Sequence, residues 1–107
     1  MFLKPETLVS KKLRNSARGE ECTINAPMCN GDRDTTVLCH FQFEGGVMGG
    51  KESDLSAGYG CSACHDYVDR RAKWGGELIS QADYFFYCGR SVIRTHKRMY
   101  ETGVLKV

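Results

Sequence analysis

The stretch Cys61-Ser62-Ala63-Cys64-His65-Asp66 decides the fold that this sequence predicts. It places two cysteines at the short Cys-x2-Cys spacing, and an earlier pair, Cys22 and Cys29, stands apart from it across residues 30–60. A structural zinc ion takes four ligands in a tetrahedron, often as two close pairs from distant parts of a chain. We therefore predict that these four cysteines hold one zinc ion.

The same stretch also fits two other patterns. His65 follows Cys64, as in c-type haem attachment, but haem would leave Cys22 and Cys29 without a role. A thioredoxin-like redox motif needs a surrounding βαβ pattern, which is not evident here. The remaining cysteines, Cys39 and Cys88, have no close cysteine neighbour in sequence, and we expect them to be small buried apolar residues.

Length and composition indicate one small globular domain. The chain has 107 residues, of which 41% are hydrophobic and 26% charged. The longest apolar run, residues 84–88, is too short to cross a bilayer, and no signal-peptide pattern opens the chain. We expect a cytoplasmic protein with no membrane partner. Thiols stay reduced in that compartment, which favours metal over disulfides.

Periodicity and turn residues predict a small α+β domain over residues 1–107, with a zinc-bound core at 10–75 and a helix and tail at 77–107. The expected elements are a helix at 11–18, strands at 21–24 and 36–43, a flexible glycine-rich loop at 45–50, a turn through Gly58 and Gly60, a helix at 62–73, a long helix at 78–101 and an edge strand at 104–107. The expected buried stripe of the long helix is Ile79, Ala82, Phe86, Gly89, Ile93, His96 and Tyr100, widened at steps of seven by Leu78, Phe85, Val92 and Met99.

Two histidines are candidates for chemistry. A zinc ion that gathers both cysteine pairs would also draw His40 and His65 together, with Asp54 between them in sequence. One neutral imidazole can act as a general base, while His65 and a carboxylate can hold a divalent cation. Asp69, one turn beyond His65, could orient its ring. His65 as a surface residue and Asp54 as a loop residue remain equally open from spacing alone. His96 falls on the apolar stripe and is read as structural.

Charge is distributed unevenly although the net charge is only +2. Residues 1–20 carry five basic and two acidic residues (+3), residues 21–69 two and eight (−6), and residues 70–107 eight and three (+5). The basic residues form three clusters: Lys11, Lys12, Arg14 and Arg18; Arg70, Arg71 and Lys73; and Arg90, Arg94, Lys97 and Arg98. This pattern predicts contacts with a nucleic-acid backbone and little sequence reading.

Four segments together resemble a known family: residues 16–22, 29–31, 36–40 and 57–69 are similar to the small prophage-encoded nucleases of the YbcO type. The resemblance covers roughly residues 10–75. That family is regarded as a ββα-metal, or HNH-like, nuclease group. The resemblance therefore implies an HNH-like core, located in the cytoplasm of a bacterial host, with metal-dependent endonuclease activity on DNA phosphodiester bonds.

The resemblance also implies roles position by position. His40 matches the general base, Asp54 falls near the middle position that is usually Asn, and His65 matches the ligand of a catalytic cation such as Mg²⁺. Cys22, Cys29, Cys61 and Cys64 match the structural zinc ligands of many HNH relatives. The sequence departs from the pattern at Asp54 and at Cys39, since the residue before the general base is often an Asp or His that binds the metal.

Two further interpretations stay open at this point. A non-catalytic zinc module that binds DNA or a recombination protein would carry the same cysteines and basic clusters. The aromatic run at residues 84–87 covers more than one helix face, which is compatible with a homodimer contact or with a core that packs on two sides.

Overall fold

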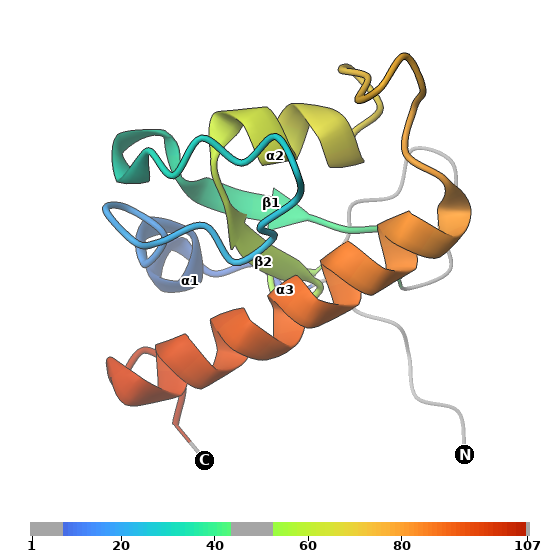
Figure 1. The fold of residues 1–107 in the computed structure, drawn as a ribbon. Helices are drawn as coiled ribbons and strands as arrows, with labels where there is room; N and C mark the ends of the chain where they lie inside the picture. Colours follow the sequence, from blue (N-terminus) through green and yellow to red (C-terminus); the bar gives the residue numbers. More distant parts are fainter. Residues whose placement is uncertain (1–7, 44–52, 107) are drawn as a thin grey trace, which may run out of the picture.

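The computed structural model describes residues 8–43 and 53–106 of a small α+β fold (Figure 1). The expected glycine-rich loop at 45–50 lies outside the described residues. The elements, in order, are α1 (Lys11–Asn15), a 3₁₀ turn η1 (Arg33–Thr35), β1 (Val37–His40), β2 (Ala57–Gly60), α2 (Ser62–Val68) and α3 (Gln81–Glu101). Figure 1 shows the two strands between α3 on one side and α2 on the other.

The strands β1 and β2 form a two-stranded antiparallel sheet in which His40 lies opposite Ala57. Because side chains alternate along a strand, neighbouring residues of β1 serve different faces. Leu38 packs with residues of α1, whereas Cys39 packs with the cysteine-rich side of the molecule. His40 shares the face of Leu38, so the strand directs this histidine toward α1.

The core has two parts. One contains five of the six cysteines, and the half-buried Cys29 packs against it. Its members are Cys22, Ile24, Ala26, Cys39, Phe41, Cys61, Cys64, Tyr67, Val68, Ile79, Tyr84 and Cys88. The other joins α1, the sheet and the end of α3, through Leu13, Ala17, Leu38, Ala57, Tyr59 and Met99. The predicted burial of Cys39 and Cys88 as core residues is confirmed.

The glycines of β2 correct one prediction. Gly58 and Gly60 were expected in a turn, yet both belong to the strand. A Cβ atom at Gly58 would lie 2.0 Å from the Ser91 hydroxyl oxygen, and one at Gly60 would lie 2.7 Å from the Cys39 sulfur. Glycine is therefore needed here because α3 and β1 approach the backbone of β2 closely.

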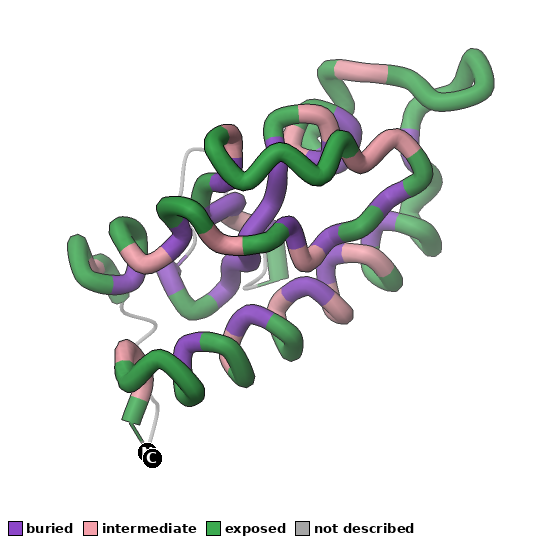
Figure 2. The backbone as a smooth tube through the Cα atoms, turned by 60° about the vertical axis from the view of Figure 1, so that its left-hand side comes forward, coloured by how far each residue is buried: buried purple, intermediate pink, exposed green. Residues whose placement is uncertain are grey.

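The buried face of α3 also differs from the predicted stripe, except at Met99. Its buried residues are Tyr84, Cys88, Ser91, Thr95 and Met99, and they recur along one side of the helix in Figure 2. Phe86 and Ile93, expected in the core, are 58% and 65% exposed. The close crossing of β2 selects small hydroxyl side chains, and the Thr95 hydroxyl accepts the backbone N–H of Tyr59 at 2.9 Å.

Several element bounds are shorter than predicted. The helix α1 ends at Asn15, and α2 ends at Val68, shortly before Arg70 adopts a positive φ of 60°. Residues 21–24 form no strand, although the Thr23 N–H donates to the Tyr59 carbonyl. Residues 104–106 also form none. No helix among the described residues is long and apolar enough to cross a membrane.

Candidate functional site

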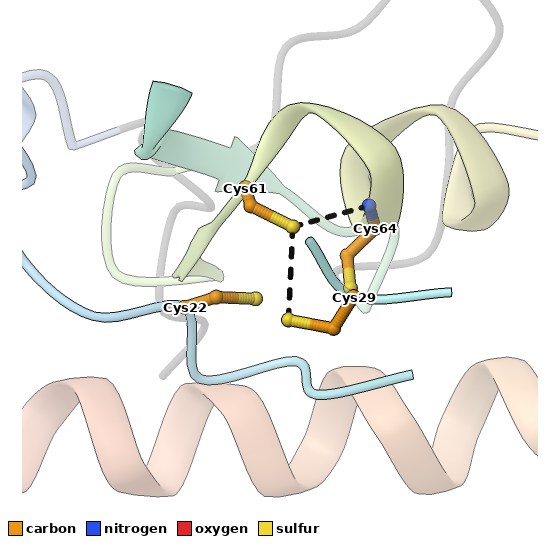
Figure 3. Close-up of side chains that lie close together, drawn as sticks. All are labelled: Cys22, Cys29, Cys61 and Cys64. Carbon is orange, nitrogen blue, oxygen red and sulfur yellow. Dashed lines mark hydrogen bonds between the residues drawn. The ribbon is translucent and has the colours of Figure 1, made fainter. Parts of the chain in front are cut away.

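Four cysteines converge from two separate parts of the chain (Figure 3). Cys22 and Cys29 begin and end a loop at residues 22–29, Cys61 follows β2, and Cys64 lies in the first turn of α2. Their four sulfur atoms all lie within 4.8 Å of one another. The predicted gathering of both pairs is therefore confirmed.

The spacing of the sulfurs suits a tetrahedral metal ion. With a Zn–S distance of about 2.3 Å, the corners of a tetrahedron lie about 3.8 Å apart. The sulfurs of Cys29 and Cys61 are 3.8 Å apart, far beyond the length of a disulfide bond. The described residues fit a zinc ion in both ligand type and spacing.

The electrostatics of the cluster point the same way. A hydrogen bond with the Cys64 thiol lowers the pKa of Cys22 to about 4, and the same contact raises the pKa of Cys64. Burial and the nearby Cys22 charge raise the pKa of Cys29. Thiolates this close repel one another, so a divalent cation is what would let the thiols ionise together.

Local hydrogen bonds hold the cysteines in place. The Cys61 sulfur accepts the backbone N–H of Cys64 at 3.5 Å and so caps α2. On the other side, the Arg90 guanidinium donates to the Ile24 carbonyl at 2.8 Å. A metal ligand whose backbone is fixed in this way needs little rearrangement when an ion binds.

The arginines of α3 therefore serve a purpose that the sequence did not indicate. Besides Arg90, Arg94 donates to the Asn25 side chain at 3.0 Å, and Arg98 forms an ion pair with Glu20 at 3.0 Å. These contacts tie α3 to residues 20–25. The cluster that we expected to meet phosphates is committed largely to the fold.

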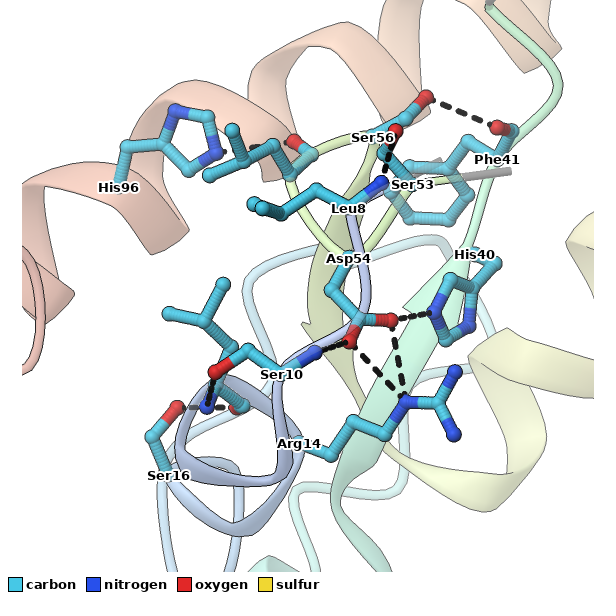
Figure 4. Close-up of polar contacts among 12 residues, drawn as sticks. Leu8, Ser10, Arg14, Ser16, His40, Phe41, Ser53, Asp54, Ser56 and His96 are labelled. Carbon is cyan, nitrogen blue, oxygen red and sulfur yellow. Dashed lines mark hydrogen bonds and ion pairs between the residues drawn. The ribbon is translucent and has the colours of Figure 1, made fainter. Parts of the chain in front are cut away.

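A second group of polar side chains lies at the end of β1 (Figure 4). The Nε2 atom of His40 is 2.6 Å from Oδ1 of Asp54, and Nε of Arg14 lies 3.1 Å from both oxygens of that carboxylate. The backbone N–H of Ser10 donates to Oδ2 at 2.6 Å. Three donors thus converge on one fully buried carboxylate.

These contacts indicate which ring nitrogen of His40 carries the hydrogen toward Asp54. Burial raises the pKa of Asp54, but the hydrogen bonds from His40, Ser10 and Arg14 outweigh it, and the net pKa lies below its usual 3.8. An ionised carboxylate can only accept, so Nε2 of His40 carries the hydrogen. In the neutral ring, Nδ1 then keeps its lone pair. The side chain is 31% exposed, which gives water access to this part of the molecule.

His65 lies in a different pair. Its Nε2 atom is 3.0 Å from Oδ2 of Asp69, one turn along α2, and Arg71 contacts the same oxygen at 3.2 Å. Burial raises the pKa of Asp69, but the His65 hydrogen bond and the nearby charges bring it below its usual value. Asp69 thus contacts the His65 ring as predicted.

The structure pairs Asp54 with His40 and leaves His65 with Asp69. Within residues 8–43 and 53–106, the four cysteines are the one group of three or more metal-binding side chains that comes together. Sequence reasoning missed the contribution of Arg14 and Ser10, which reach Asp54 from about forty residues away, a separation that leaves no local signal. His96 donates one hydrogen bond from Nε2 to the Leu55 carbonyl at 2.9 Å, as a structural histidine would.

The fold and the site define a small α+β domain built around a four-cysteine cluster of metal-binding type. Over residues 11–104 the chain matches the family described as "Putative nuclease YbcO", and it belongs to that family.

Two relatives and one solved structure agree with this assignment. "Putative nuclease YbcO" of Escherichia coli (strain K12) and "Putative nuclease ybcO" of Enterobacteria phage 82 are each 39% identical over 97 residues, covering 88% of this chain and 96% of theirs. The solved structure of a putative bacteriophage protein from E. coli str. K-12 substr. MG1655 shows the same fold, with a TM-score of 0.69 and 33% identity. The structural match covers 86% of this chain and 100% of the solved chain.

Proposed function

We propose that this protein is a metal-dependent endonuclease of prophage origin that hydrolyses DNA phosphodiester bonds. Membership of a family named as nucleases supports the general activity. The observation that carries the mechanism is the 2.6 Å pair of His40 and Asp54 at the end of β1. A strand–strand–helix order around this pair is compatible with an HNH-like core.

In this proposal His40 is the general base. Its Nδ1 lone pair takes a proton from the water molecule that attacks phosphorus. The ring then becomes positively charged, and the Asp54 carboxylate at Nε2 stabilises that charge and keeps the ring in one orientation. Arg14 holds Asp54 ionised, so its role toward His40 is one of positioning.

His65 and Asp69 are the proposed ligands of a catalytic cation. They offer one nitrogen and one oxygen, and Mg²⁺ commonly binds through one or two protein carboxylates together with waters and phosphate oxygens. When bound, Mg²⁺ or a similar cation would stabilise the charge on the phosphate and on the leaving oxygen. The four cysteines would hold zinc in a purely structural role.

The core prediction of this proposal is cleavage that depends on His40. Supercoiled plasmid is incubated with the wild type and Mg²⁺ or Mn²⁺, and nicking is followed on gels. We expect His40→Ala to lose cleavage while keeping its zinc content and circular dichroism spectrum. His96→Gln is the matched control, because glutamine can keep the hydrogen bond to Leu55.

Two results would go against the proposal. Equal nicking by wild type and His40→Ala would refute the role of His40. Salt-sensitive DNA binding without cleavage under any cation would instead favour a non-catalytic zinc module.

A further inference from the structure

An open hollow of about 360 Å³ lies between α1 and β1, next to His40. Its lining includes two guanidinium groups, Arg14 and Arg18, along with Asn15, Thr36 and His40. No carboxylate is among the described residues that line it. The hollow therefore presents positive charge and hydrogen-bond donors to whatever enters it, which suits an anionic group.

The arginines have donors to spare. Arg14 contacts Asp54 through Nε, so its two terminal nitrogens remain for another acceptor within the described part of the chain. Arg18 is exposed and forms no side-chain hydrogen bond or ion pair with residues 8–43 or 53–106. Two such guanidinium groups beside one hollow match the donor pattern that binds phosphate oxygens in pairs.

Thr36 provides an independent sign of a missing ligand. This residue is only 4% exposed, and its hydroxyl oxygen has no hydrogen-bond partner among the described residues. Buried polar atoms without partners are uncommon in folded proteins because desolvation is then uncompensated. The oxygen is itself buried beneath the wall of the hollow, so an oxygen-rich anion in the hollow would become its partner after a small shift of that wall.

We propose that this hollow binds a backbone phosphate of the nucleic-acid substrate through Arg14, Arg18 and Thr36. The inference rests on the proposed nuclease function, and it adds the substrate-positioning residues on the α1 side of His40. A phosphate held here brings the sugar–phosphate chain against the one face of β1 on which the His40 ring lies. Arg14 then links the two tasks, since it contacts Asp54 with one nitrogen and offers the others to phosphate.

The test measures DNA binding by fluorescence anisotropy without added divalent cation, so that binding does not depend on cleavage. Arg18→Ala should weaken binding ~10-fold and lower the slope of log Kd against log salt by about one. Lys12→Ala removes one charge from α1 at a position outside the hollow and should leave the slope unchanged. Thr36→Val should weaken binding ~3- to 10-fold without lowering the melting temperature of the free protein.

A scan of oligonucleotides with one neutral methylphosphonate each then locates the phosphate. In the wild type, a methylphosphonate at one position should weaken binding ~10-fold. In Arg18→Ala, a methylphosphonate at the same position should weaken binding by less than about twofold. An identical scan in both proteins would overturn the proposal. A second combination of results would also overturn it. If the two scans do not differ, while inorganic phosphate raises the melting temperature of the wild type but not of Arg18→Ala, the hollow binds a free anion and not the nucleic-acid backbone.

The two proposals can fail separately. Coupling between Arg18 and one phosphate in a protein that nicks no plasmid would retain the phosphate site and reject the nuclease. Nicking that requires His40, with no such coupling, would retain the nuclease and reject the phosphate site.

Discussion

Replacing Cys61 with serine should unfold this domain, whereas replacing Cys88 with serine should not. Both cysteines are fully buried. Cys61 belongs to the four-sulfur cluster, while Cys88 lies outside it on α3. The pair of variants therefore separates the loss of a metal ligand from the general cost of burying a hydroxyl group.

The magnitudes differ enough to decide between the two. A domain of this size is stable by about 5–15 kcal/mol. Structural zinc sites contribute about 10–16 kcal/mol at neutral pH in zinc-finger peptides, so losing one ligand can remove most of the net stability. Cys88→Ser places a hydroxyl group in an apolar site at a cost of about 1–3 kcal/mol. That variant should remain folded with its zinc.

The assay combines elemental analysis with urea unfolding followed by circular dichroism. We expect about one zinc per chain in the wild type and in Cys88→Ser, and little zinc or cooperative unfolding in Cys61→Ser. Protein purified without chelators is essential, since chelation alone should mimic Cys61→Ser. If Cys61→Ser unfolds at the same urea concentration as Cys88→Ser, or if the wild type contains no metal, the reasoning is refuted.

Two further predictions concern packing and pH. Gly58→Ala should cost about 2–4 kcal/mol in unfolding free energy because its Cβ would meet the Ser91 side chain, whereas Gly89→Ala, which meets nothing within 4 Å, should stabilise α3 by up to about 1 kcal/mol. Equal unfolding midpoints for the two variants would contradict the close crossing of α3 and β2. Asp54→Asn should cost about 1–3 kcal/mol at neutral pH, since Arg14 and His40 are partly exposed and can turn to water. Folding lowers the pKa of Asp54, so the stability that its ionised form provides is present above the ordinary pKa of 3.8 and is lost as the pH falls through the lowered value. The difference in unfolding free energy between Asp54→Asn and the wild type should therefore close in acid. A difference that stays constant in acid would reject the hydrogen-bond network around Asp54.

The cysteine cluster was predictable because the sequence spacing of its cysteines indicates metal binding. Two close pairs of thiols in a short chain have few other uses, and the structure brings their sulfurs within 4.8 Å. The pairing of His40 with Asp54 was less accessible. The sequence placed both near a common site and indicated Asp69 as the partner of His65, but the direct contact of Asp54 with His40 depends on the path of the chain.

The long helix shows where periodicity fails. Its existence, its C-terminal end at Glu101 and the burial of Met99 were predicted, but the rest of its buried face was not. The predicted buried face was based on large apolar residues such as Phe86 and Ile93, whereas the helix packs on β2 through Ser91 and Thr95. Ser91 can approach β2 because Gly58 has no side chain, and this contact joins residues that are far apart in sequence.

The most direct test of the central claim is rescue of His40→Ala by added imidazole in the plasmid-nicking assay. If the Nδ1 atom of His40 removes a proton from water, the variant should cleave ~10²- to 10⁴-fold more slowly than wild type. Free imidazole should then restore part of that rate in proportion to its unprotonated form and leave the wild-type rate unchanged. Cleavage by His40→Ala at the wild-type rate, with or without imidazole, would contradict the account.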